Sequence, residues 1–342
     1  MPIRKTTILG FKIFIVFLKK LKAVKKSLRL FYIKIYIILI PFNGHAFFSG
    51  YFRILYFKMT KILNINIMKK ILVPTDFSPI AKNALDVAAD IAKKNNAKIV
   101  LLNVKMYPTS DVASYYSLYG ASGVSINDAW QEILEKAKDE MKHEIVHYKD
   151  VKIQPLVEES GEHFVGALLD HRADLIVMGS TGASGFKEFF SGSNSEEVVR
   201  MATCPVLVVK GDQNVFAPKK VVFAVDLTHE EFIDKAMLTL NLEDAEVHFL
   251  HVDDGNRKIN YLNTELRMQN TAKKHGFENC KFEILNADSI ESGILEYASD
   301  VEADLIIMYT HGRKGFNHFF RGSIAEDVVN HSKVSVFTYV EN

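Results

Sequence analysis

One unit of sequence occurs twice in this chain of 342 residues, with its motifs in the same order. The segment ADLIVMGSTGASGFKEFFSGSNSEEVV (173–199) matches ADLIIMYTHGRKGFNHFFRGSIAEDVV (303–329) at an offset of 130 residues. The other matched pairs are KKILVPTDFSPIAKNAL (69–85) with KKVVFAVDLTHEEFIDKAM (219–237) and AKIVLLNV (97–104) with AEVHFLHV (245–252), at offsets of 150 and 148. A repeat of this length predicts two copies of one folding unit rather than a single large core.

The repeat and the distribution of charge divide the chain into four parts. Residues 1–67 hold thirteen Lys or Arg and no Asp or Glu, whereas the rest of the chain holds 29 basic and 41 acidic residues, a net charge of −12. After this basic, apolar extension we expect a first domain over 68–210, a linker over 211–218 and a second domain over 219–342. The acidic charge of the two domains argues against a nucleic-acid partner, which would require a basic surface.

The basic extension allows three interpretations. It is a start codon placed too early, with Met68 as the true first residue, or a targeting segment, or a basic amphipathic arm that binds membranes. Its apolar runs are interrupted by lysines and are shorter than the roughly 18 residues that a spanning helix needs. No small-residue cleavage site follows an apolar core. We therefore favour Met68 as the start, and we expect a membrane partner only if residues 1–67 belong to the working protein.

The two cysteines have neither metal-binding nor redox spacing. Cys204 precedes a proline and an apolar run, and Cys280 also enters a strand-like pattern. Both are typical of small core residues in a reducing compartment, so we expect a cytoplasmic protein.

The first unit alternates short apolar runs with segments of helical periodicity. Strands are expected near 70–75, 97–104, 151–157, 174–178 and 205–209. The helix after the first strand should begin with Ser78 as N-cap and Pro79 at its first position, and should bury a stripe formed by Ile80, Ala84, Val87 and Ile91. This alternation predicts an α/β fold with an open, parallel, doubly wound sheet in each half. Ligands of such sheets bind at the carboxyl ends of the strands, near the switch in strand order.

A glycine-rich loop follows the fourth expected strand. Its glycines stand at 179, 182, 185 and 192, and Ser193 begins a helix with the capping-box pattern SNSE (193–196), repeated as SIAE (323–326) in the second unit. Free backbone N–H groups, the helix dipole and close-approach glycines together favour a phosphate site. The alternative is that the glycines only form capped turns.

The pattern Gly179-x2-Gly182-x9-Gly192-Ser193 resembles the ATP-binding motif of the universal stress protein family. ILVPTDFS (71–78) is similar to the first strand of that family and CPVLVV (204–209) to its last. The resemblance covers both units, essentially all of 68–342, so the chain resembles a tandem universal stress protein. It implies two Rossmann-like domains, each with a five-stranded, mostly parallel sheet flanked by helices. It also implies a role in the stress response through ATP, or through AMP or a cyclic nucleotide, with Mg²⁺ accompanying ATP.

The resemblance also implies which residues bind the nucleotide. Pro74 and Asp76 would contact the adenosine, Val104 would pack on adenine, and the glycines with the following serine would hold the phosphates. The full implied set is Pro74, Asp76, Val104, Gly179, Ser180, Gly182, Gly192, Ser193, Asn194 and Ser195. The alternative for Asp76 is a turn-forming role at the end of a strand.

The second unit departs from the motif. It retains Asp226, Val252, Gly312, Gly322 and Ser323, but Tyr309 replaces the first glycine. A tyrosine ring would stand where a nucleotide needs bare backbone, so we expect one competent site per chain, in the first half. The family resemblance further implies pairing through the last strands, either between PVLVV (205–209) and VSVFTYV (334–340) as an internal pseudo-dimer or in a homodimer.

Motifs of catalysis are missing from the sequence. It contains no GxxxxGK[ST], GxGxxG or GxSxG pattern, and no nucleophile–base pair can be placed beside the glycines, so a non-catalytic binding module is favoured over a slow ATP hydrolase or nucleotidyl-transfer enzyme. HEIVH (143–147) matches a zinc signature. Its helix, however, is expected to bury Ile133, Ala137, Met141 and Ile145, which turns both histidines toward solvent; we expect no metal.

Overall fold

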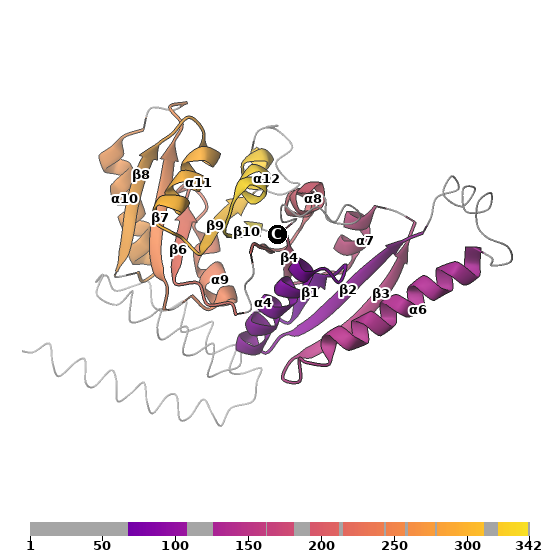
Figure 1. Cartoon of the computed structure of the whole chain (residues 1–342). Coiled ribbons are helices and arrows are strands. Elements are labelled where there is room, and N and C mark those ends of the chain that lie inside the picture. Colours follow the sequence, from indigo (N-terminus) through magenta and orange to yellow (C-terminus); the bar gives the residue numbers. More distant parts are fainter. Residues whose placement is uncertain are drawn as a thin grey trace, which may run out of the picture. The chain divides into compact units, whose positions relative to one another are not determined.

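The computed structural model describes residues 68–107, 126–161, 163–180, 192–211, 215–242, 244–256, 259–277, 279–310 and 321–340, all within one compact unit (Figure 1). The basic extension and two predicted site residues, Gly182 and Gly312, lie outside them, as do the side chains of Ser193 and Ser323. None of the helices in these ranges has the length and apolar character needed to cross a membrane.

Strands and helices alternate in both halves. The first half comprises β1 (Lys70–Pro74), α4 (Pro79–Asn95), β2 (Lys98–Met106), α6 (Ile126–Ile145), β3 (Lys152–Ser160), α7 (Phe164–Asp170), β4 (Leu175–Gly179), α8 (Gly192–Met201) and β5 (Val206–Val209). The second half comprises β6 (Lys220–Ala224), α9 (Glu231–Leu240), β7 (Glu246–Asp253), α10 (Tyr261–Lys274), β8 (Cys280–Asn286), α11 (Ile290–Asp300), β9 (Leu305–Thr310), α12 (Arg321–His331) and β10 (Ser335–Val340). The predicted α/β class is confirmed.

The strands form one ten-stranded sheet in the order β3-β2-β1-β4-β5-β10-β9-β6-β7-β8. Within each half all neighbours are parallel, and the halves join where β5 and β10 pair antiparallel, with Phe337 opposite Leu207. The predicted internal pairing of the last strands is therefore confirmed. Pairing with a second copy of the chain stays a prediction.

The core lies on both faces of the sheet. Side chains from α7, α8, α11 and α12 share one buried cluster with strand residues such as Leu72, Val104 and Val336. In the first half, α4 and α6 cover the opposite face (Figure 1). The nearly continuous burial of β1, β4, β5 and β10 follows from this double cover.

Helix α4 forms as its sequence predicts. The Ser78 side chain accepts a hydrogen bond from the Ala81 backbone N–H, and Pro79 occupies the first turn, where its missing N–H costs nothing. Ala84, Val87 and Ile91 are buried as predicted, whereas Ile80 in the first turn is only partly buried. Asn96 ends the helix in a left-handed conformation.

One local prediction is wrong. On α6 the side chain of Ile133 is 46% exposed, while Trp130, Leu134, Ala137 and Met141 are buried. Trp130 reaches Glu159 on β3 through its indole N–H, which fixes the rotation of the helix. Helix α8 begins at Gly192 and α12 at Arg321, one and two residues before Ser193 and Ser323. The side chains of these serines lie outside the described residues, so the two capping boxes stay a prediction.

Candidate functional site

The first half has its switch in strand order between β1 and β4. From β1 the chain continues to β2 on one side, whereas β4 pairs with β1 on the other. Such a switch opens a crevice at the carboxyl ends of the two strands. Pro74 and Gly179 end these strands, and both are buried. Asp76 follows β1 by two residues and Val104 lies two residues before the end of β2, so the predicted residues Pro74, Asp76, Val104 and Gly179 all lie toward the same carboxyl edge of the sheet.

The remaining predicted residues follow β4. Ser180 is buried, and its backbone N–H donates to the Val209 carbonyl at 3.0 Å. Asn194 and Ser195 lie in the first turn of α8, with Ser195 buried. A first helical turn presents backbone N–H groups without intrahelical partners, which suits an anion.

Asp76 shapes the turn between β1 and α4. Its Oδ1 accepts from the Ser78 backbone N–H at 2.9 Å, and Thr75 Oγ1 accepts from the Phe77 N–H at 3.0 Å. Phe77 adopts a positive φ of 65°. The turn-forming alternative for Asp76 is therefore realised, and it leaves the half-buried carboxylate at the mouth of the crevice.

Gly179 is required by the packing of the chain itself. A Cβ at this position would lie 2.9 Å from the Ile80 carbonyl oxygen, closer than real Cβ contacts come. The φ of Gly179 is not in the left-handed region. Close approach of the first turn of α4, rather than unusual backbone geometry, therefore explains this glycine.

Asn103 is a site residue that the sequence analysis missed. It is 2% exposed on β2, next to Val104, and its Nδ2 donates to the Thr75 carbonyl at 2.7 Å. Its Oδ1 is buried without a hydrogen-bond partner in the described part of the chain. The sequence did offer one sign of this role, because Asn103 is a polar residue within the apolar run of an expected strand. In the second half His251 binds the Val225 carbonyl in the same way, so a side chain of the second strand supports the loop after the first strand in both halves.

In the second half Asp226 is bonded within its own loop. Its Oδ1 accepts from the backbone N–H groups of Thr228 and His229, and its Oδ2 lies 2.7 Å from Thr228 Oγ1 and 2.9 Å from His229 Nδ1. Burial raises the pKa of Asp226, but these hydrogen bonds outweigh it and the pKa lies below its ordinary value. Val252 packs against α11, where a Cβ on Gly293 would lie 2.6 Å from it.

Tyr309 stacks face to face on His229. The ring centroids are 4.2 Å apart and the planes differ by 5°. Tyr309 on β9 is paired with Tyr339 on β10, and Gly179 on β4 is paired with Val209 on β5. Tyr309 therefore occupies the position in the second half that Gly179 occupies in the first. Gly322 opens α12 in its first turn, at the same edge.

Comparison with known proteins places the chain in a family. A model of the universal stress protein family matches residues 68–210 and again 218–339. The chain belongs to this family.

Among its relatives, a universal stress protein (Slr1230) of Synechocystis is 25% identical over 80% of this chain and all of its own length. Universal stress protein MJ0531 of Methanocaldococcus jannaschii is 32% identical over 42% of this chain and 84% of its own. The crystal structure of a universal stress protein from Archaeoglobus fulgidus covers 80% of this chain and 96% of its own with a TM-score of 0.59 and 23% identity, which is evidence for the fold alone.

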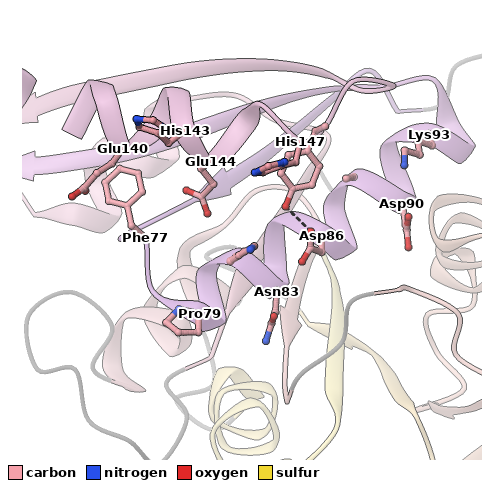
Figure 2. A pocket seen from close by; sticks show the side chains of 13 residues that line it. Phe77, Pro79, Asn83, Asp86, Asp90, Lys93, Glu140, His143, Glu144 and His147 are labelled. Atoms are coloured by element: carbon pink, nitrogen blue, oxygen red, sulfur yellow. Dashed lines mark hydrogen bonds between the residues drawn. The ribbon is translucent and has the colours of Figure 1, made fainter. Parts of the chain in front are cut away.

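This universal stress protein also has a hollow between α4 and α6. It measures about 870 Å³ and includes Phe77, Asp86, Glu140, Glu144 and Tyr148 in its lining (Figure 2). The Tyr148 hydroxyl donates to Asp86 Oδ1 at 2.5 Å. Burial, and then the nearby carboxylates of Asp86, Asp76 and Glu140, raise the pKa of Glu144 against the opposing effect of Lys82.

The two histidines of the HEIVH segment line this hollow. His143 and His147 are both exposed, as predicted. In the described ranges no three His, Cys, Asp or Glu side chains are grouped so that they could hold a metal ion. The segment therefore belongs to the wall of the hollow, with Glu144 facing the same space (Figure 2).

Proposed function

We propose that the first half binds ATP, or a related adenine nucleotide such as AMP or a cyclic nucleotide, in the crevice between β1 and β4. The chain would act in the stress response as a nucleotide-dependent binding module. The observation that carries this proposal is the placement of Pro74, Asp76, Val104 and Gly179 toward one carboxyl edge of the sheet, at the switch in strand order. Family membership supports it, because the sequence motif at this edge resembles the family's ATP pattern.

The proposed roles follow from chemistry. The Asp76 carboxylate would accept a hydrogen bond from a hydroxyl group of the ribose. Pro74 and Val104 would make apolar contacts with the adenosine. Backbone N–H groups at the start of α8 would hold the phosphates, together with Gly179, Ser180, Gly182, Gly192, Ser193, Asn194 and Ser195; the Ser180 N–H itself is already bonded to Val209. Mg²⁺ would bind together with ATP, coordinated by the phosphates of the nucleotide. Asn103 would support the site through the loop that carries Thr75.

A non-catalytic role is favoured over catalysis. The polar groups of the loop after β1 bond its own backbone: Thr75 Oγ1 accepts from the Phe77 N–H and Asp76 Oδ1 from the Ser78 N–H, which is a turn-forming role. The rival is a slow ATP hydrolase or nucleotidyl-transfer enzyme, which would need only a positioned water. Release of ADP, AMP or pyrophosphate by the wild type, abolished in Asp76→Asn, would favour the rival.

The test is calorimetric titration of Mg²⁺–ATP into the full chain and into two matched variants. Asp76→Asn keeps the oxygen that accepts from Ser78 and removes the charge, and Asp226→Asn makes the same change in the second half. Loss of a charged hydrogen bond worth about 1.5–3 kcal/mol predicts a tenfold or greater loss of affinity in Asp76→Asn. We expect no change in Asp226→Asn. Equal affinities for all three proteins, or no binding by the wild type, would contradict the proposal.

A further inference from the structure

The switch in strand order recurs in the second half, between β6 and β9. The crevice expected at this switch is spanned by two side chains of the chain itself. Tyr309 comes from β9 and His229 from the loop between β6 and α9, and their rings stack at 4.2 Å. The stack therefore joins the two strand ends between which a ligand of a doubly wound sheet would enter.

The two halves differ in the length of the loop after their first strand, and also in the residue at the equivalent positions 179 and 309. Residues 75–78 connect β1 to α4, whereas residues 225–230 connect β6 to α9, so the second loop is two residues longer. In the first half the early helix start brings the Ile80 carbonyl within 2.9 Å of a Cβ at position 179, which excludes any side chain. In the second half the longer loop goes with a tyrosine at the matching position 309. The Gly-to-Tyr difference thus accompanies the later start of the helix in the second half.

Polar contacts hold the His229 side of the stack. His229 Nδ1 lies 2.9 Å from Asp226 Oδ2 and 2.8 Å from Thr228 Oγ1. The next residue, Glu230, accepts from Thr271 Oγ1 at 2.6 Å and from Lys274 Nζ at 2.8 Å, both on α10. The long loop is thereby anchored at both of its ends.

Aromatic contacts hold the Tyr309 side. Phe232 on α9 and Tyr339 on β10 lie with ring centroids 6.2 and 6.5 Å from that of Tyr309. Lys235 Nζ donates to the Tyr339 hydroxyl and lies 5.1 Å from the centre of its ring. Neighbours on three elements therefore fix the orientation of Tyr309.

Asp226 helps to hold His229 in the stacked position. Both oxygens of Asp226 accept hydrogen bonds from Thr228 or His229. A ligand hydroxyl that approached Asp226 would have to replace one of these hydrogen bonds, two of which come from His229. The stacked rings therefore close the second crevice, and the Asp226 carboxylate, which would accept a hydrogen bond from a ligand, is already bonded within its own loop.

We infer that the Tyr309–His229 stack is a built-in plug that occupies the ligand crevice of the second half and limits the chain to one nucleotide. The nucleotide itself rests on the proposed function, whereas the plug rests on the geometry above. Removing both rings opens the crevice and frees Asp226 and the start of α12 at Gly322 for a second nucleotide.

The experiment combines ATP titration with a spectroscopic readout, both on the full chain. Tyr309→Gly/His229→Ala removes the plug, and Tyr309→Phe keeps the ring as the matched control; thermal unfolding checks that each variant is folded. We expect one site in the wild type and in Tyr309→Phe, and two sites in the double variant. Two sites in the wild type, or one site in a folded double variant, would overturn the plug.

The spectroscopic readout does not depend on nucleotide. In the NMR spectrum the imidazole protons of His229, assigned by His229→Gln, should be shifted upfield by the Tyr309 ring and should move downfield in Tyr309→Leu. If the wild type binds no ATP but this shift is present, the proposed function fails while the stack on which the plug rests is confirmed. Unshifted His229 protons would refute the plug whatever the stoichiometry.

Discussion

Gly179 offers a sharp test of why the strand-end glycine exists, and the perturbation is Gly179→Ala. The added Cβ would meet the Ile80 carbonyl oxygen at 2.9 Å and the Ile80 Cγ1 at 3.0 Å. An ordinary contact begins near 3.4 Å, so β4 and the first turn of α4 must separate by about 0.5 Å. Because the carbonyl is backbone inside a hydrogen-bonded turn, the strain cannot be relieved by a side-chain rotation.

The magnitude follows from two opposing effects. Overpacking of this kind costs about 1–3 kcal/mol, and the stiffer unfolded chain returns about 0.4–1 kcal/mol. We expect a net loss of about 1–2 kcal/mol in the free energy of unfolding. Urea unfolding without nucleotide measures it, and the melting temperature should fall by roughly 2–4 °C for each kcal/mol.

Gly161→Ala is the matched control. A Cβ at Gly161 meets nothing within 4 Å, and its φ is not in the left-handed region, so its stability should change by less than about 0.5 kcal/mol. If Gly179→Ala were as stable as wild type but failed to bind ATP, the glycine would serve the ligand and not the packing of α4, and our explanation of this position would be refuted.

Two further predictions concern stability. The pKa of Glu144 is raised in the folded state, so the folded chain binds its proton more readily than the unfolded chain, and this group's contribution to stability falls as pH rises from about 4.5 through the raised pKa. Glu144→Gln should therefore stabilise the chain more at pH 8 than at pH 4 in urea titrations, and an equal effect at both pH values would exclude this explanation. Phe337→Ala, at the fully buried junction opposite Leu207, should cost about 3–5 kcal/mol of unfolding free energy; a loss below about 1 kcal/mol would mean that the two halves do not share this core.

Much of the fold follows from local sequence. The repeat predicts two equivalent halves, and Ser78 followed by Pro79 predicts the start of α4, because capping depends on residues within one turn. The gathering of Pro74, Asp76 and Gly179 at one edge was also predictable, since the carboxyl ends of parallel strands share an edge.

Other features depend on contacts between distant residues. The rotation of α6 was predicted wrongly around Ile133, because the hydrogen bond from Trp130 to Glu159 on β3 decides which side of the helix is buried. Asn103 escaped notice because its role appears only when the Thr75 carbonyl lies next to it. The hollow beside Glu144 needs α4 and α6, which are far apart in sequence.

The sequence by itself determined the fold class, the duplication and the difference between Gly179 and Tyr309, since each is written in the order and spacing of residues. The tertiary structure decided what that difference means. Only when α4 is packed against β4 does the Ile80 carbonyl exclude a side chain at position 179, and only when the longer loop folds over β9 does His229 meet Tyr309. The pattern of residues along the chain determines which helices and strands form. Which side chains fit between those elements depends on the packing of segments that are far apart in the sequence.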